Sequence, residues 1–352
     1  MITIHIKTIG NDNFKRVLSI RYPDDFHVHF RQGLMLHNVI NHTAAQFKRA
    51  MVMPNTEPAI KNGDDVKRYY QEIMDALDPE NHCFQPLMTF KITPSTTIND
   101  IQSVVGLVIA GKLYPDGVTT NSEGGVTDYQ ALYPIFEAMQ EHKIILSLHG
   151  EKSNTFCLDR EEQFLSILCQ ITQDFPRLKI VLEHISTKAA VDLIEKLPDT
   201  VAATITLHHL ELTLDDVIGS LNNPHNFCKP IAKRKEDREA LRKAAFSCNP
   251  KFFFGSDSAP HLRTNKECSS GCAGIFSAPV LIPSLISLFE KYDTLNLLED
   301  FVSRFGAEFY GLPLNEDKIY FIENEWQVPL DYSGIVAYKS GEYMAWQIYN
   351  IC

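Results

Sequence analysis

The sequence predicts an α/β fold in which eight parallel strands, each followed by a helix, close into a (β/α)8 barrel. Apolar, β-branched runs recur along the chain, and a polar loop and a helical pattern follow each of them. Continuous apolar strands that alternate with helices indicate a parallel sheet that is buried on both faces. Eight such units within about 230 residues suit a closed barrel.

The expected strands are short, and in chain order they cover residues 26–30, 49–54, 84–90, 105–114, 144–150, 179–185, 201–206 and 251–257. The clearest helical patterns lie between them, at residues 63–77, 128–143, 187–197 and 235–246. The alternative is an open, doubly wound sheet, which normally carries a Gly-rich phosphate-binding turn after its first strand. No G-x-G-x-x-G sequence follows the first expected strand, which ends in histidines instead.

The eight strand-helix units span about residues 24–312, and we expect one domain over residues 1–352. Length alone would suggest two domains, but barrels of about 250 residues commonly form one. Residues 1–20 and 315–352 lie outside the units, so we expect them to pack at the periphery as an extra strand or cap.

The composition excludes several classes of partner. The chain has 33 Lys and Arg against 44 Asp and Glu, a formal net charge of −11, which argues against nucleic-acid and anionic-membrane partners. The N-terminus lacks a signal-peptide pattern, and the apolar stretch 275–289 contains two prolines and three serines, which favours a buried helix over a membrane span. Eight cysteines are too dilute for a disulfide scaffold. We therefore expect a soluble, cytoplasmic protein.

Metal-binding side chains stand at the C-terminal ends of the expected strands, where barrels of this kind carry their catalytic groups. His27 and His29 lie in "DDFHVHF", and residues two apart on a strand point to the same face, so both imidazoles can hold one cation. The other strand ends supply one residue each: Lys112 on the fourth, His149 on the fifth, His184 on the sixth and Asp257 on the eighth.

Each of these residues also has an ordinary structural explanation. A single histidine at a strand end is more often hydrogen-bonded than metal-bound, Asp257 could cap a helix, and Lys112 could be a surface lysine. A purely structural explanation would require all of them to reach one rim independently, so the metal site is the stronger hypothesis. Zinc enzymes usually use three protein ligands and an open position, which makes this set too large for one such ion and small for two.

With this set, the chain resembles the amidohydrolase superfamily and, within it, the short, class II dihydroorotases of bacteria and fungi. The resemblance rests on "RYPDDFHVHFRQG", "VMPNTEP", "KLYPDGVTTNSEGGVTD", "LHGE", "EHISTK" and "GSDSAPH...KECSSGCAG", and it runs from about residue 18 to about residue 312. It implies an enzyme of pyrimidine biosynthesis, commonly a homodimer, with two zinc ions per chain. Such an enzyme interconverts N-carbamoyl-L-aspartate and L-dihydroorotate.

The resemblance also implies a role for each residue at the rim. It gives two groups of ligands: His27, His29 and Asp257 for one zinc ion, and His149 and His184 for the other. Lys112, carboxylated on Nζ by carbon dioxide to N6-carboxylysine, would bridge the two ions. A hydroxide held between the ions would attack the amide, with Asp257 as general acid and base.

Substrate contacts follow from the same resemblance. Arg31, Asn55 and His261 would hold the substrate carboxylate, and a guanidinium can do so with two parallel hydrogen bonds. The backbone near Ala273 would contact the pyrimidine ring. From the residues alone, Arg31 is more simply a solvated charge and Asn55 a turn residue.

The segment 115–125 is rich in Gly, Asn, Ser and Thr, and taken alone it is a flexible surface loop. The resemblance makes it a lid in which Thr119 and Thr120 close over bound substrate. The chain departs from the family in about ten additional residues before the matched region, and in "TLHH" at residues 206–209, where "TPQH" is expected. The sequence leaves open whether His208 alters the pocket or faces outward.

Two other functions compete with this interpretation. A hydantoinase or dihydropyrimidinase shares the metal set, but is usually longer and need not bind a carboxylate through Arg31 and Asn55. A non-catalytic relative would typically have lost metal ligands, whereas this chain keeps all six.

Overall fold

The computed structural model describes residues 2–9, 13–119, 122 and 124–349. Its centre is a barrel of eight parallel strands, which are hydrogen-bonded in chain order from β3 to β10. The strands are β3 (Asp24–Val28), β4 (Arg49–Val52), β5 (Gln85–Ile92), β6 (Ala110–Leu113), β7 (Ile145–His149), β8 (Ile180–Glu183), β9 (Val201–Ile205) and β10 (Phe252–Phe254). The predicted (β/α)8 architecture is confirmed.

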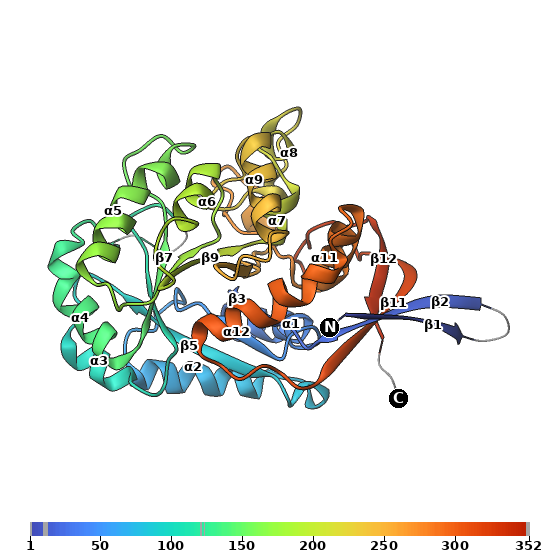
Figure 1. Ribbon diagram of the computed structural model, residues 1–352, viewed down its shortest axis with the longest axis horizontal. Helices are drawn as coiled ribbons and strands as arrows, with labels where there is room; N and C mark the ends of the chain where they lie inside the picture. The colour runs from blue at the N-terminus through green and yellow to red at the C-terminus, as the bar shows by residue number, and fades with distance from the viewer. Residues whose placement is uncertain (1, 10–12, 120–121, 123, 350–352) are drawn as a thin grey trace.

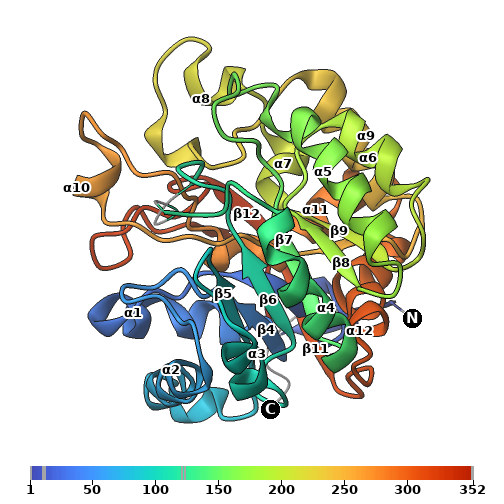
Figure 2. The same ribbon diagram turned by 90° about the vertical axis from the view of Figure 1, so that its left-hand side faces the viewer.

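Helices surround the barrel on its outside (Figures 1 and 2). They are α1 (Gly33–Ala44), α2 (Gly63–Asp75), α3 (Ile98–Val104), α4 (Tyr133–His142), α5 (Arg160–Asp174), α6 (Lys188–Ile194), α7 (Leu207–Glu211), α8 (Asp215–Ile218), α9 (Lys235–Ala245), α10 (Arg263–Lys266), α11 (Leu281–Lys291) and α12 (Phe305–Tyr310). Their apolar faces bury against the strands; α2, for example, buries Val66, Tyr69 and Ile73, which are spaced three and four residues apart.

The largest error in the predicted strand boundaries lies at the start of β6. The run 105–114 was expected to be extended throughout, but β6 begins only at Ala110. The backbone N–H groups of Leu107 and Val108 donate to the carbonyl of Val104, 2.9 and 3.3 Å away, and Gly106 has a φ of +77°. The first half of the run therefore closes the C-terminal end of α3 and does not extend the strand.

The barrel closes between its first and last strands through a few hydrogen bonds instead of a full ladder. The backbone N–H of His29 donates to the carbonyl of Ser258 over 3.0 Å, and that of Asp257 donates to the carbonyl of His27 over 2.8 Å. The buried carboxylate of Asp25 accepts from the N–H groups of Ser256 and His27. This seam fixes Asp257 directly beside the two histidines of strand β3.

A second sheet lies beside the barrel and joins the two ends of the chain (Figure 1). It is antiparallel, with the order β1 (Thr3–Ile9), β2 (Asn13–Arg21), β11 (Lys318–Gln327) and β12 (Tyr343–Ile348). Trp346 on β12 is completely buried, and α11 packs against that strand. That the whole chain is one domain stays a prediction.

The apolar stretch 275–289 forms a buried helix, as expected, although α11 begins only at Leu281. Among the described residues, the helices are all too short or too polar to cross a bilayer.

Candidate metal centre

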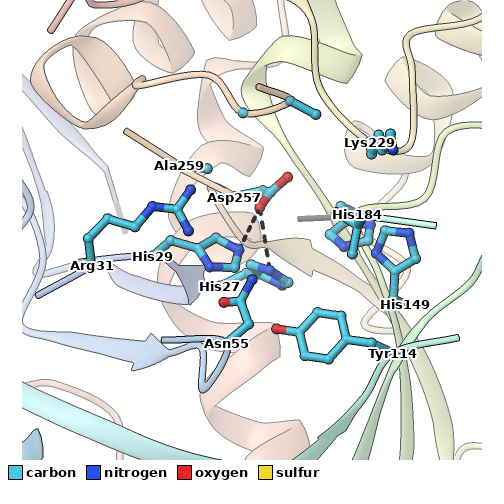
Figure 3. A pocket seen from close by; sticks show the side chains of 13 residues that line it. His27, His29, Arg31, Asn55, Tyr114, His149, His184, Lys229, Asp257 and Ala259 are labelled. Carbon is cyan, nitrogen blue, oxygen red and sulfur yellow. Dashed lines mark ion pairs between the residues drawn. The ribbon is translucent and has the colours of Figure 1, made fainter. Parts of the chain in front are cut away.

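Five of the six predicted metal ligands line one cavity at the C-terminal ends of the barrel strands (Figure 3). Its wall consists of His27, His29, Arg31, Asn55, Tyr114, Thr119, His149, His184, Lys229, Asp257, Ala259, Ala273 and Gly274. The sixth, Lys112, is completely buried on β6, with Glu183 and Asp257 as its electrostatic neighbours. The structure therefore brings together all six residues that the sequence places at strand ends.

The first group of potential ligands consists of His27, His29 and Asp257. Oδ1 of Asp257 lies 3.2 Å from Nε2 of His29 and 3.5 Å from Nε2 of His27, and one ligand atom of each residue lies within 4.8 Å of the others. Two imidazole nitrogens and a carboxylate oxygen at such separations can bind a single divalent ion and leave a position open for water or substrate.

The second group lies beside the first. The ring centroid of His184 is 4.9 Å from that of His27 and 4.8 Å from that of His149. Nδ1 of His184 is buried, with no hydrogen-bond partner among the described residues. A buried imidazole next to another imidazole, without a full set of hydrogen bonds, suits a metal ligand.

Lys112 lies close to two anionic side chains, those of Glu183 and Asp257. Its Nζ is buried and makes no hydrogen bond within the described part of the chain. Burial lowers the pKa of this amine to about 8, although Glu183 and Asp257 act in the opposite direction. A substantial fraction is therefore neutral near physiological pH, and the neutral amine is the form that reacts with carbon dioxide.

The protonation states of the other groups also suit metal binding. Burial lowers the pKa of His29 to about 4 and holds the pKa values of His149 and His184 below the ordinary range, so these imidazoles are neutral with free lone pairs. Burial alone would raise the pKa of Asp257. The hydrogen bond with His29 and the electrostatic interactions with His27 and His29 outweigh this effect of burial, so the carboxylate stays ionised.

Two buried glutamates orient the histidines, and neither was predicted from the sequence. Oε2 of Glu183 lies 2.9 Å from Nδ1 of His27 and also accepts from the hydroxyl of Thr204, and Glu151 lies 2.8 Å from Nε2 of His149. A carboxylate on one ring nitrogen fixes the tautomer that turns the other lone pair to a metal. The available signal was a glutamate directly before or two residues after a ligand, in "LEHI" and "LHGE".

Three residues at this rim have strained backbone conformations. Arg31, His184 and Asp257 have φ values of 61°, 41° and 45°, in the left-handed region that residues other than glycine rarely adopt. Such conformations persist where the surrounding structure holds them, and they cluster at functional sites. Here they turn an arginine, an imidazole and a carboxylate into the same cavity.

The predicted carboxylate-binding residues lie at one end of the cavity. Nη2 of Arg31 lies 3.0 Å from Nε2 of His261, and its Nε donates to the carbonyl of Pro260 over 3.0 Å. The same nitrogen of His261 lies 3.0 Å from the carbonyl of Ala273, so it either accepts from Arg31 or donates to Ala273. Figure 3 shows Asn55 below His27, on the cavity wall between Arg31 and Tyr114.

The remaining predicted residues have mixed outcomes. Thr119 lines the cavity, and its backbone N–H donates to the hydroxyl of Ser122 over 2.9 Å, whereas Thr120 lies outside the described residues. His208 is not among the residues that line the cavity, and it does not face outward, because it is completely buried. Lys229, which was not predicted from the sequence, also lies on the cavity wall (Figure 3).

Comparison with known proteins shows the family. The model of the amidohydrolase family matches residues 24–315, so the chain belongs to that family. Two curated relatives named dihydroorotase, from Shewanella denitrificans and Coxiella burnetii, are each 44% identical to it. The first alignment covers 94% of this chain and 98% of the relative, and the second covers 95% and 98%.

Solved structures agree with this assignment. A dihydroorotase from Campylobacter jejuni has a TM-score of 0.88 at 42% identity, and the alignment covers 95% of this chain and 98% of that one. A dihydroorotase from Saccharomyces cerevisiae in complex with 5-fluoroorotic acid has a TM-score of 0.89 at 38% identity, with the same coverage. An L-hydantoinase from Arthrobacter aurescens matches at a TM-score of 0.77 but only 14% identity, which shows the shared fold alone.

Proposed function

We propose that this protein is a two-zinc dihydroorotase that interconverts N-carbamoyl-L-aspartate and L-dihydroorotate in pyrimidine biosynthesis. The observation that carries this proposal is a single cavity in which four imidazoles and a carboxylate adjoin an arginine–histidine pair. The names of relatives at about 44% identity over nearly the whole chain support the choice of substrate.

The donor set fits two ions. His27, His29 and Asp257 would hold one ion and His149 and His184 the other, with carboxylated Lys112 between them. The neutral imidazoles supply lone pairs. Nζ of Lys112 is buried and has no hydrogen-bond partner among the described residues, so no such bond would have to break before it reacts with carbon dioxide. Two zinc ions bound here would polarise the amide carbonyl and lower the pKa of water toward ~7.

Asp257 is placed to move the proton. Its carboxylate is ionised and sits at the seam of the barrel, 3.2 Å from His29. In ring opening it would accept the proton of the attacking water and pass it to the leaving ring nitrogen. Cyclisation would run through the same group in reverse, as microscopic reversibility requires.

Binding of the substrate carboxylate would fall to Arg31, with Asn55 and His261 beside it. Burial and the nearby charge of Arg31 lower the pKa of His261 to about 3, so this imidazole is neutral and adds no second charge. The backbone at Ala273 would meet the pyrimidine ring, and Thr119 and Thr120 would close over the substrate. Assembly as a homodimer, which the family resemblance implies, and a cytoplasmic location, which is expected from the sequence, remain predictions.

A comparison of substrates tests the proposal. Zinc-loaded protein should turn over L-dihydroorotate and leave dihydrouracil, which lacks the carboxylate, essentially untouched. Arg31→Met should lower kcat/KM for dihydroorotate by about 10- to 100-fold, because one charge-assisted contact of 1.5–3 kcal/mol is lost. The matched control Arg68→Met, on the exposed face of α2, should leave it unchanged. Preference for dihydrouracil or hydantoin would overturn the assignment in favour of a different cyclic amide hydrolase.

A further inference from the structure

A second cluster of metal-binding side chains lies behind the wall of the main cavity. His208 and His209 lie on α7, directly after β9, and Cys228 lies on the segment that leads to α9. One ligand atom of each residue lies within 4.8 Å of the others, and all three side chains are at least 99% buried. The ring centroids of the two histidines are 4.7 Å apart.

His208 has no ordinary structural explanation. Both of its ring nitrogens are buried and have no hydrogen-bond partner in the described part of the chain. A buried imidazole carries at least one N–H group, and leaving it unpaired is costly, so such groups call for a specific explanation. Burial also lowers its pKa to about 4, which leaves a neutral ring with a lone pair available for a metal.

We propose that His208, His209 and Cys228 form a further binding site for a thiophilic divalent cation of the zinc type, separate from the two-metal centre. The combination of one thiolate and two imidazoles selects such an ion over magnesium or calcium, which prefer oxygen ligands. The main cavity offers only nitrogen and oxygen ligands.

The distances among His209, Cys228 and Pro230 are close to those around a tetrahedral ion. Sγ of Cys228 lies 3.9 Å from Nε2 of His209, and the carbonyl of Pro230 lies 2.9 Å from that nitrogen and 3.2 Å from the sulfur. Around a tetrahedral zinc with bonds of about 2.0 Å to nitrogen and 2.3 Å to sulfur, neighbouring ligand atoms are about 3.3–3.6 Å apart. The Pro230 carbonyl can therefore serve as a fourth ligand after shifts of a few tenths of an ångström.

Binding of the ion would replace the hydrogen bonds that His209 and Cys228 donate to Pro230 with bonds to the metal. Without the ion, Nε2 of His209 and the thiol of Cys228 both donate to Pro230, and the hydroxyl of Thr206 donates to Nδ1 of His209. With the ion, His209 takes its other tautomer, so that Nδ1–H donates to Thr206 and Nε2 binds the metal. Burial raises the pKa of the Cys228 thiol to about 12, so formation of the thiolate–metal bond releases one proton per ion at neutral pH.

The site would brace the main cavity. Cys228 is adjacent to Lys229, which lines that cavity, so a cation here would tie this part of the wall to α7.

Cobalt titration tests the proposal, because a thiolate bound to Co²⁺ gives a near-ultraviolet charge-transfer band that nitrogen and oxygen ligands do not give. Metal-free protein titrated with Co²⁺ should develop this band, and Zn²⁺-loaded protein should contain one more ion per chain than the Cys228→Ser variant. Cys228→Ser should abolish the band, and Cys272→Ser, which changes a cysteine outside the cluster, should keep it.

His208→Gln provides a second variant that retains the thiol. It should weaken Co²⁺ binding, read from the band, by at least tenfold. Absence of the band in the wild-type protein, its persistence in Cys228→Ser, or unchanged affinity in His208→Gln would overturn the proposal. The spectrum is independent of turnover, so a failure of the proposed enzymatic activity would leave this test intact.

Discussion

Glu183 shows how much of the site depends on residues that never touch the substrate. It accepts hydrogen bonds from Ser147 and Thr204 as well as from His27, so its position is fixed on three sides. The ring of His27 is thereby held with Nε2 toward Asp257 and the cavity. Affinity for the metal should depend on this carboxylate even though it does not bind the ion itself.

Glu183→Gln should lower zinc affinity by about 10- to 100-fold, since the amide is a poorer acceptor for the imidazole N–H. Competition with a chelator of known affinity measures this directly. Glu195→Gln, an exposed glutamate on the outside of the barrel, is the matched control. Equal zinc affinity in both variants would show that the glutamate has no role in orienting His27.

The lowered pKa of Lys112 predicts how the recovery of activity depends on pH. Its pKa of about 8 means that the reactive neutral amine increases as pH rises toward 8 and is nearly complete above it, whereas an ordinary lysine requires pH above ~10.4. After removal of zinc and bicarbonate, recovery of activity at constant carbon dioxide pressure should accelerate up to about pH 8 and then level off. A rate that continues to climb through pH 10 would contradict the role assigned to burial.

At this scale, the sequence predicted that six potential metal ligands lie at one rim, because the strand ends of a barrel share one edge. It could not predict Glu183 and Glu151. Acidic residues occur throughout the chain, and only the fold shows which of them lie behind a histidine ring.

At the scale of elements, local signals decide the helix boundaries. Asn62 begins α2 with its side-chain oxygen accepting from the backbone N–H groups of Asp64 and Asp65, 3.1 and 3.0 Å away. This cap can be predicted from the sequence, because an asparagine stands directly before an amphipathic run. The start of β6 shows the opposite case, because the local signal is misleading there. Residues 105–108 resemble part of an apolar strand, but they follow the C-terminal end of α3.

Asn62→Ala should lower the free energy of unfolding by about 1 kcal/mol, because two N–H groups at the start of α2 lose their acceptor. Urea denaturation of metal-free protein measures the change. Lys67→Ala, at an exposed position in the same helix, should change stability by no more than ~0.5 kcal/mol. A similar loss in both variants would mean that the cap makes no specific contribution.

At the scale of the whole molecule, the two ends of the chain meet in one sheet. Strand β11 pairs with β2 from Lys318 opposite Arg21 to Ile322 opposite Val17. A pairing across about 300 residues has no local signal, so the sequence indicated peripheral segments without their partner. The barrel itself was predictable because its strands pair with their neighbours along the chain.

Buried neutral histidines make the fold sensitive to acid. The pKa of His208 is about 4 in the folded protein and about 6.5 when unfolded, so between these values the unfolded chain binds the extra proton. The stabilisation is complete above pH 6.5 and is lost as pH falls toward 4, by on the order of 3 kcal/mol for this residue. Unfolding free energies of chelated protein should fall over this range.

The slope should be shallower in His208→Gln and unchanged in His142→Gln, whose side chain is exposed. Urea denaturation at several pH values between 4 and 7 provides the comparison. Parallel curves for the wild type and His208→Gln would contradict the assignment of a neutral, buried His208.

The most direct test of the proposed function follows dihydroorotate by its ultraviolet absorbance in both directions, with zinc- and bicarbonate-loaded protein. Wild-type protein should reach the same equilibrium from N-carbamoyl-L-aspartate and from L-dihydroorotate. Lys112→Ala should lose turnover in both directions, and Lys196→Ala, at an exposed site, should retain it. Wild-type protein that binds zinc but interconverts neither compound would contradict the proposed function.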